Sequence, residues 1–403
     1  MAEPVGVYIS VPFCKAKCTF CNFASGVFGA ERMQQYVDRL CVEIRGTDAA
    51  ALKLKAGLPR SVETVYFGGG TPSLLSAAQF RQIFEHLRGE FDLAGGAEIT
   101  LECAPGQLSG ETLDELLGQG MNRISFGVQS FIDRESNAVG RLHTEVECEA
   151  EIARVRAAGM PEINLDLIAG LPHQTAQSWR YSVERAIASG VPHVSVYLLE
   201  VDDESRLGRE MLEHGTRYGA SEVPSEDAAA EWYLEACAAL NAAGVEQYEI
   251  SNFARRGHRS RHNLKYWQRE PYIGFGLDAH SMLRSDGGAI RFANTSNLDE
   301  YLGKCASPFP LLDTSAAPEF DWIGRSKAFE EALFLGLRLN DGVELERLRN
   351  EFGEQMIGVA MDALLEVRDA GLLELSSERM RLTPQGRLAS NEVFSRLLIP
   401  SAA

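Results

Sequence analysis

The sequence predicts an α/β protein, a complete or partial parallel (β/α) barrel followed by a small C-terminal α+β unit. Two observations predict the barrel. Up to about residue 255, seven short apolar runs alternate with amphipathic, helix-like stretches, and this alternation is typical of parallel βα units. Several runs are also apolar on both faces, as strands are when helices cover one side and a packed interior the other. A doubly wound sheet remains the alternative.

The seven apolar runs are the expected strands. They cover residues 6–11, 62–67, 97–102, 123–128, 163–168, 194–199 and 245–250. In a parallel barrel the functional groups lie at the carboxyl ends of the strands. Polar or metal-ligating residues stand at six of these ends: Cys14, the turn GGGT at 68–71, Glu102, Gln129, Asp166 and Glu200. We therefore expect one site on that rim.

The C-terminal part of the chain reads as a separate unit. We expect a barrel with its extension over residues 1–304, a linker rich in Ser, Pro and Asp over 305–321, and a second unit over 322–403. Helical patterns near 325–338, 344–352 and 355–370, the hairpin LLELSSERMRLT and a last helix near 386–398 resemble a winged helix. Residues 321–403 carry 10 basic and 14 acidic side chains, a balance that argues against DNA binding.

Net charge and the distribution of apolar residues exclude some classes of function. The 403 residues carry a formal net charge of −18, whereas nucleic-acid binding needs a basic face. No apolar run approaches the length of a membrane span, and the N-terminus lacks a signal pattern, so we expect a cytoplasmic protein. Five dispersed cysteines are expected to be small buried side chains without disulfides. They are Cys41, Cys103, Cys148, Cys237 and Cys305.

The remaining cysteines, Cys14, Cys18 and Cys21, form a Cys-x3-Cys-x2-Cys cluster after the first expected strand. Structural zinc takes four ligands, usually with paired Cys-x2-Cys spacing, and no fourth Cys or His follows at a suitable distance. Iron–sulfur cubanes usually take four cysteines as well. A cubane held by three thiolates leaves one iron open, and an open position implies a ligand that the chain does not supply.

This arrangement resembles the radical S-adenosylmethionine family, in which three cysteines at this spacing hold a 4Fe–4S cluster and S-adenosylmethionine chelates the open iron. The resemblance is closest to the branch that contains oxygen-independent coproporphyrinogen III oxidase and the HemW-type heme chaperones. It rests on YISVPFCKAKCTFCNF, VYFGGGTPSLL, RISFGVQSF, NLDLIAGLPHQT, YEISNFAR and RHNLKYW. The S-adenosylmethionine contacts that it implies are Tyr8, Gly69, Gly70, Thr71, Glu102, Gln129, Arg141 and Asp166.

Two features favour the chaperone side of this branch. The oxidases resemble Cys-x3-Cys-x2-Cys-x-Cys, but Phe23 stands at the last position here, and HNLKYW at 262–267 matches the chaperone motif His-Asn-x-x-Tyr-Trp. The resemblance implies that His262 holds heme, with Tyr266 and Trp267 as flat apolar surface for the porphyrin. The alternative is that these residues lock a loop. His280 is a weaker ligand candidate, expected to be structural.

The expected function is therefore heme binding and delivery to an acceptor protein. The alternative is an oxidase-like enzyme that cleaves S-adenosylmethionine reductively to a 5′-deoxyadenosyl radical and decarboxylates porphyrinogen propionates, which requires an electron donor. An iron–sulfur protein with another partner is the third possibility. Three departures from the family pattern leave the pocket's detail open: Ala104, Asp278 and the acidic run at 201–205. The oligomeric state stays undetermined.

Overall fold

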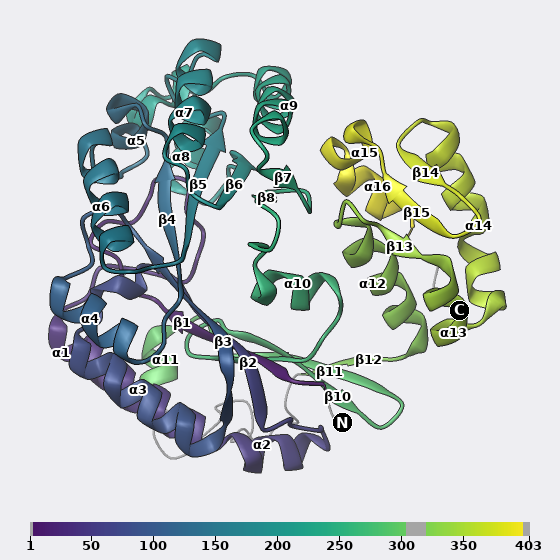
Figure 1. The fold of residues 1–403 in the computed structure, drawn as a ribbon, viewed down its shortest axis with the longest axis horizontal. Helices are drawn as coiled ribbons and strands as arrows, with labels where there is room; N and C mark the ends of the chain where they lie inside the picture. The colour runs from purple at the N-terminus through teal and green to yellow at the C-terminus, as the bar shows by residue number, and fades with distance from the viewer. Residues whose placement is uncertain (1–2, 304–319, 398–403) are drawn as a thin grey trace.

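The large sheet of the protein begins with parallel strands in chain order (Figure 1). The computed structural model describes residues 3–303 and 320–397. The strands are β1 (Val5–Val11), β2 (Ser61–Gly69), β3 (Asp92–Cys103), β4 (Arg123–Gln129), β5 (Glu162–Ala169) and β6 (His193–Leu198). Each pairs in parallel with the next. Because the spatial order of these six strands never reverses, they form the wall of a barrel, and the doubly wound alternative is wrong.

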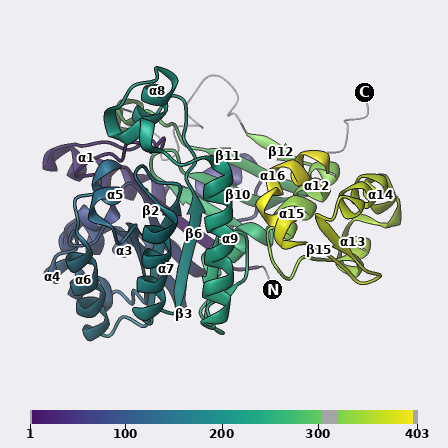
Figure 2. The same ribbon diagram turned by 90° about the horizontal axis from the view of Figure 1, so that it is seen from above.

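Helices cover the outer face of this wall (Figures 1 and 2). The longer ones are α1 (Ala30–Arg45), α3 (Ala77–Glu90), α4 (Gly110–Gly118), α6 (Glu145–Ala157), α7 (Ala176–Ala188) and α9 (Glu226–Ala242); shorter ones are α2 (Thr47–Leu54), α5 (Asp133–Ala138) and α8 (Arg206–Leu212), with 3₁₀ turns at Pro72–Leu74 and Arg217–Glu222. Capping boxes begin α3, α6 and α7. Such a box satisfies two main-chain donors that the first turn leaves unpaired.

The seventh expected strand, 245–250, is wrong. Only Glu246–Gln247 forms a strand, β7, because the chain turns back at once: the Tyr248 amide donates to the Asn252 carbonyl at 3.0 Å. The returning strand β8 (Asn252–Ala254) pairs antiparallel with β6. This antiparallel edge stops the addition of parallel strands, so within the described residues the barrel is partial and open.

An extension continues the sheet on the other side of β1. It comprises β9 (Tyr272–Phe275), β10 (His280–Ser285), β11 (Gly288–Ala293) and β12 (Asp321–Ile323). Strand β9 is parallel to β1, and the later pairs are antiparallel. The short helix α10 (Arg261–Trp267) lies on the open side of the barrel, and α11 (Leu298–Gly303) follows β11.

The C-terminal unit has its own apolar core and its own three-stranded antiparallel sheet. Its elements are α12 (Arg325–Leu337), β13 (Val343–Glu344), α13 (Leu345–Phe352), α14 (Glu354–Asp369), β14 (Leu373–Leu375), β15 (Arg379–Leu382), α15 (Pro384–Leu388) and α16 (Ser390–Arg396). Three helices followed by a hairpin confirm the winged-helix-like prediction. The single last helix is wrong, because Ala389 (φ −94°, ψ 27°) leaves helical geometry and divides it in two.

The predicted division of the chain is only partly visible. The boundary at residue 322 falls inside β12, which is paired to the large sheet through β11. Residues 304–319, most of the predicted linker, lie outside the described residues, as does Cys305. Of the other dispersed cysteines, Cys41, Cys103 and Cys148 are buried and Cys237 is half-buried; all the described cysteines are free thiols. Among the described helices, none combines the length and the apolarity needed to cross a membrane.

A buried carboxylate fastens α1 to the extension. Glu43 is fully buried and accepts hydrogen bonds from the Tyr301 hydroxyl (2.5 Å), the Gly276 amide (3.0 Å) and the Asn294 amide group (2.5 Å). These three donors come from α11 and from the ends of β9 and β11. One side chain therefore joins the first helix to three later segments.

Glu43→Ala is expected to lower the free energy of unfolding by about 3 kcal/mol or more, because it leaves three buried donors without an acceptor. Chemical denaturation monitored by circular dichroism measures this. Glu31→Ala, exposed in the first turn of the same helix, is the control and is expected to change the value by less than about 0.5 kcal/mol. Equal effects of the two variants would contradict the assignment.

Candidate functional site

The loop that carries the three cysteines follows β1 and is held by main-chain hydrogen bonds. The Cys14 amide donates to the Gly26 carbonyl at 2.8 Å, and the Thr19 amide donates to the Val139 carbonyl at 3.1 Å. The acidic run after β6 also reaches this loop, because Asn22 donates to the Asp202 carboxylate at 3.3 Å. The acidic run at 201–205, which departs from the family pattern, thus supports the cysteine loop.

The three thiols are free and half-buried. Across the described parts of the chain, no three His, Cys, Asp or Glu side chains converge closely enough to hold one metal ion. A cubane places each thiolate on a different iron, so its cysteines need not converge on one metal ion. Three free thiols on one short loop, Cys14, Cys18 and Cys21, are a donor set that suits such a cluster.

The glycine turn after β2 lies directly against the cysteine loop. The Gly70 amide donates to the Val11 carbonyl (2.8 Å), and the Thr71 amide donates to the Phe13 carbonyl (2.7 Å). A Cβ atom on Gly70 would stand 2.7 Å from that Phe13 oxygen. Glycine is therefore required here by close approach. At Gly69 the backbone itself requires it, with φ at +104°.

Two carboxylates lie on the inner face of the barrel next to this turn. Glu102 accepts hydrogen bonds from the Tyr66 hydroxyl (2.8 Å) and the Gly69 amide (3.2 Å). Asp166 accepts from Ser125 (3.0 Å) and Asn164 (2.8 Å). Burial raises the pKa of both groups, that of Glu102 to about 7, and their mutual repulsion adds to the rise for Glu102. A cationic or hydroxyl-bearing ligand would stabilise the charged form of both carboxylates.

Arg141 places a positive charge near these carboxylates. This charge offsets part of the rise in the pKa of both groups. The Arg141 side chain passes Gly127 on β4 so closely that a Cβ atom on Gly127 would stand 2.3 Å from Nη2 of Arg141. Within the described parts of the chain, its Nε is buried without a hydrogen-bond partner, and so is Oε1 of Gln129, at the end of the same strand. Buried polar atoms normally have partners. These two atoms are therefore an open donor and an open acceptor for a polar ligand.

His262 lies inside the barrel and is 1% exposed. Both ring nitrogens are used: Nδ1 is 2.8 Å from the Thr64 hydroxyl, and Nε2 is 2.9 Å from the Tyr266 hydroxyl. The ring also stacks on Tyr66. Burial lowers the pKa of His262 to about 3, with the charge of Lys265 adding to the effect. In this arrangement the imidazole is neutral and has no free nitrogen.

Trp267 faces the other way, toward the C-terminal unit. The guanidinium of Arg338 lies over its ring, 4.2 Å from the ring centroid. Beside it, the Asn340 side chain donates to the Gln247 carbonyl at 2.7 Å, and the Ile250 amide donates to the Arg338 carbonyl at 3.1 Å. The motif at 262–267 therefore joins the barrel interior to the second unit. Its predicted contact with heme stays a prediction.

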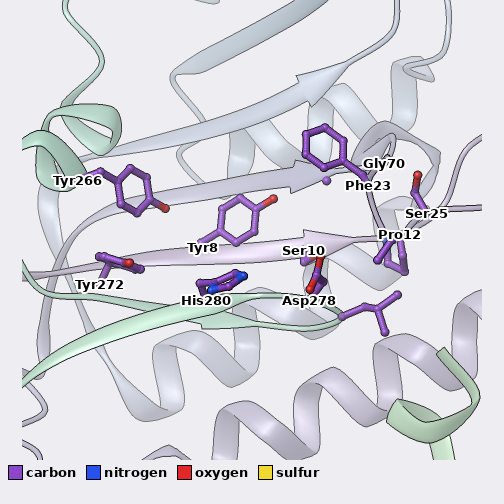
Figure 3. A pocket seen from close by; sticks show the side chains of 13 residues that line it. Tyr8, Ser10, Pro12, Phe23, Ser25, Gly70, Tyr266, Tyr272, Asp278 and His280 are labelled. Carbon is purple, nitrogen blue, oxygen red and sulfur yellow. The ribbon is translucent and has the colours of Figure 1, made fainter. Parts of the chain in front are cut away.

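A cavity of about 340 Å³ opens at the carboxyl end of β1, and Figure 3 shows the side chains around it. It brings together the predicted residues Tyr8, Gly69, Gly70 and Tyr266. Its other lining residues are Ser10, Pro12, Phe23, Ala24, Ser25, Tyr272, Leu277, Asp278 and His280. Glu200, predicted on the same rim, is exposed and is not part of this lining.

The sequence analysis missed two parts of this site. Tyr66, which donates to Glu102, lies opposite Tyr8 in the β1–β2 register. Because side chains alternate between the two faces of a strand, the sequences of β1 and β2 could have placed both tyrosines on the inner face. Tyr272 on β9 was not identified either, and the β9–β10 turn was noted only for Asp278, as a departure from the family pattern, and for His280, as a weaker ligand candidate. Only the parallel pairing of β9 with β1 brings that turn to the cavity.

A partial parallel barrel with three cysteines on the loop after its first strand is the arrangement of radical SAM proteins. The sequence pattern of the Radical SAM superfamily matches residues 8–186, and that of the HemN C-terminal domain matches residues 325–389. In structure, the chain is similar to the coproporphyrinogen III oxidase HemN of Escherichia coli. The TM-score is 0.82 at 23% identity, over 98% of this chain and 90% of that one.

Among curated proteins, the chain is 34% identical to heme chaperone HemW of Bacillus subtilis, over 97% of this chain and 98% of that protein. It is 30% identical to the mitochondrial radical S-adenosyl methionine domain-containing protein 1 of Mus musculus, over 97% and 87%. The identity to heme chaperone HemW of Lactococcus lactis is 32%, over 99% and 98%. The chain belongs to the HemW family of radical SAM proteins.

The raised pKa of Glu102 predicts a pH dependence of stability. Between its ordinary value of 4.5 and about 7, the folded protein keeps a proton that the unfolded chain has lost. The contribution of Glu102 to the free energy of unfolding is therefore complete below pH 4.5 and falls as pH rises through 7, by about 3 kcal/mol at most.

Glu102→Gln should make the decline of stability between pH 5 and 7.5 shallower than in the wild type, since glutamine does not titrate. Denaturation curves at stepped pH values measure this slope. Glu111→Gln, exposed on α4, is the matched control and should keep the wild-type slope. Parallel curves for wild type and Glu102→Gln would refute the prediction.

Proposed function

We propose that this protein is a heme chaperone that carries a 4Fe–4S cluster and S-adenosylmethionine and delivers heme to an acceptor protein. The similarity to proteins named heme chaperone HemW, over nearly the full length of both chains, carries the proposal. Phe23 supports it, because it stands where the related oxidases are expected to have a further cysteine. We also propose that it acts in the cytoplasm.

Cys14, Cys18 and Cys21 would hold the cluster, and S-adenosylmethionine would occupy its open iron. Such a pair supplies reductive cleavage of a carbon–sulfur bond when an electron donor is present. The chain's own residues hold the nucleotide: Glu102 and Asp166 offer carboxylates to ribose hydroxyls or the amine. Arg141 offers its guanidinium to the methionyl carboxylate, a pairing that suits its planar fork.

The positions of the site residues also suggest a separate role for each of the two units. We propose that the barrel, residues 1–304, holds cluster, cofactor and heme, and that residues 322–403 cover the open side through the contacts around Arg338. Ion pairs such as Arg269–Glu351 and Arg291–Glu331 also join this unit to the extension of the sheet. The acceptor and the electron donor are further parts of the proposal, defined only by their roles.

A coproporphyrinogen oxidase-like enzyme is the second candidate, favoured by the similarity in fold to HemN of Escherichia coli. That similarity, at 23% identity, concerns the fold alone. The enzyme candidate requires turnover of a porphyrinogen, whereas a chaperone requires only a stable complex and its transfer. The two therefore differ in a direct measurement.

Titration of the anaerobically reconstituted full chain with heme is expected to give a saturable one-to-one complex, because a chaperone must retain its cargo. The Soret band provides the readout, and a coproporphyrinogen assay on the same preparation is expected to show no decarboxylation. Decarboxylation with release of product would replace the proposal with the enzyme candidate. Absence of a heme complex would overturn it.

Gly127→Ala is expected to weaken S-adenosylmethionine binding by about tenfold to a hundredfold. The added methyl group displaces the Arg141 guanidinium, and a charge-assisted hydrogen bond contributes roughly 1.5–3 kcal/mol. Calorimetric titration of the cluster-loaded protein measures the affinity. The control is Gly118→Ala at the end of α4, where a Cβ meets nothing within 4 Å, and it is expected to bind as the wild type does. An unchanged affinity in Gly127→Ala would exclude Arg141 as a cofactor contact.

A further inference from the structure

A second cavity, of about 210 Å³, lies where the extension of the large sheet meets the C-terminal unit. Strands β10 and β11 and the residue Arg269 form one side of this junction cavity, and the start of α12 and the end of α13 form the other. Strand β12 connects the two sides, since it pairs with β11 and leads into α12 (Figure 1). Among the described residues, none lines both this cavity and the one at the carboxyl end of β1. The junction cavity is therefore a site separate from the one beside the cysteine loop.

The junction cavity is rich in arginine, although the whole chain carries a net charge of −18. Its charged lining residues are Arg269, Arg284, Arg325, Glu331 and Glu351. Both acidic side chains are engaged in ion pairs. Glu351 pairs with Arg269 at 3.0 Å, and Glu331 pairs at 2.9 Å with Arg291, which lies outside the lining. The lining therefore keeps positive charge that its own carboxylates do not offset.

Arg325 is the lining charge without a partner. Arg284 lies 3.4 Å from the exposed carboxylate of Glu3. The side chain of Arg325, in contrast, forms neither an ion pair nor a hydrogen bond within residues 3–303 and 320–397. Arg325 is also exposed, so a ligand can reach its guanidinium. Because no contact of the fold depends on this guanidinium, its removal should leave the fold intact.

The first turn of α12 adds the partial positive charge of a helix N-terminus. The helix has 13 residues, and no side chain caps its beginning, where Gly324 is the N-cap. The Ala328 amide donates to the Gly324 carbonyl at 2.9 Å, and the amides before Ala328 have no carbonyl of their own helix to bind. Gly324, Arg325 and Ala328 all line the cavity. Such a helix end attracts anions.

On the other side of the cavity, Arg269 is a buried residue with an unused donor. It is 8% exposed, and its guanidinium carbon lies 5.4 Å from the centroid of the Phe352 ring. Nη1 donates to Glu351, but Nε is buried without a partner in the described part of the chain. Nη2 of Arg284 donates to the Arg269 carbonyl at 2.7 Å, which brings a second guanidinium to the same wall. Since buried donors normally have partners, the free donor of Arg269 indicates a ligand.

We infer that the junction cavity binds a phosphate group between Arg269 and Arg284 of the extension and Arg325 at the start of α12. Guanidinium groups bind phosphate oxygens through paired hydrogen bonds. Three of them together with a helix N-terminus suit a tetrahedral anion better than a planar carboxylate. Pockets for drug-sized ligands measure about 300–1,000 Å³, so a cavity of about 210 Å³ suits inorganic phosphate or a small phosphate ester. The anion would join the two units, and this role does not depend on the proposed chaperone function.

Calorimetric titration of the full-length, cluster-loaded protein in a phosphate-free buffer tests this inference. Inorganic phosphate and glycerol 3-phosphate are the two probes, because a phosphate group reaches the protein either as a free ion or on a small organic molecule. One-to-one binding is expected for at least one probe, and the tighter probe identifies the source. Acetate is expected to bind more weakly than both. Tighter binding of acetate would overturn the assignment of phosphate.

Arg325→Gln is expected to lose about tenfold or more in affinity for the tighter probe, because it removes a charge-assisted contact. Without phosphate it should keep the thermal midpoint of the wild type, since Arg325 has no partner within the described residues.

The matched control is Arg256→Gln, which removes the same charge from another place. Arg256 is exposed in the segment after β8, outside the cavity lining, and its side chain forms no ion pair or hydrogen bond with the described residues. It should bind phosphate as the wild type does. Equal affinities in wild type and Arg325→Gln, or equal losses in the two variants, would overturn the inference. So would the absence of binding by the wild type at millimolar concentrations of both probes.

Discussion

The site depends on one main-chain contact, the docking of the glycine turn after β2 on the residues that lead into the cysteine loop. Hydrogen bonds from Gly70 and Thr71 to the carbonyls of Val11 and Phe13 fix where that loop leaves the barrel. No side chain fits between the two backbones. The position of three flexible thiols is thus set by rigid peptide groups, which is what a cluster with one open iron requires.

From this contact the electrostatics of the pocket follow. The Gly69 amide, in the same turn, donates to Glu102, so the turn that positions the cysteine loop also orients a carboxylate. Glu102 and Asp166 are half-buried and repel each other when both are charged. The positive charge of Arg141 offsets part of this repulsion. Among the described residues, Nε of Arg141 and Oε1 of Gln129 have no hydrogen-bond partner, which agrees with the proposal that S-adenosylmethionine binds here.

The helix α10 has two faces with different tasks. His262 and Tyr266 fill the barrel behind the cavity, while Trp267 packs under Arg338 of the C-terminal unit. Tyr266 reaches the cavity lining as well. The motif therefore joins the wall of the cavity to the C-terminal unit.

The sequence by itself determined the local parts of the protein: the parallel strands β1 to β6, the cysteine spacing, the glycine turn and the winged-helix-like unit. Each is encoded in a short segment, through alternating apolar residues, capping residues or glycine. Tertiary structure decided the rest. The strand expected at 245–250 became a hairpin edge, because the chain turns back at Tyr248 and the returning strand β8, not this segment, pairs with β6. His262 is buried by contacts with Thr64 and Tyr66 of β2, and the turn after β9 reaches the cavity because β9 pairs with β1 although more than 250 residues separate the two. Burial and access depend on such distant contacts, and no short segment of the chain records them.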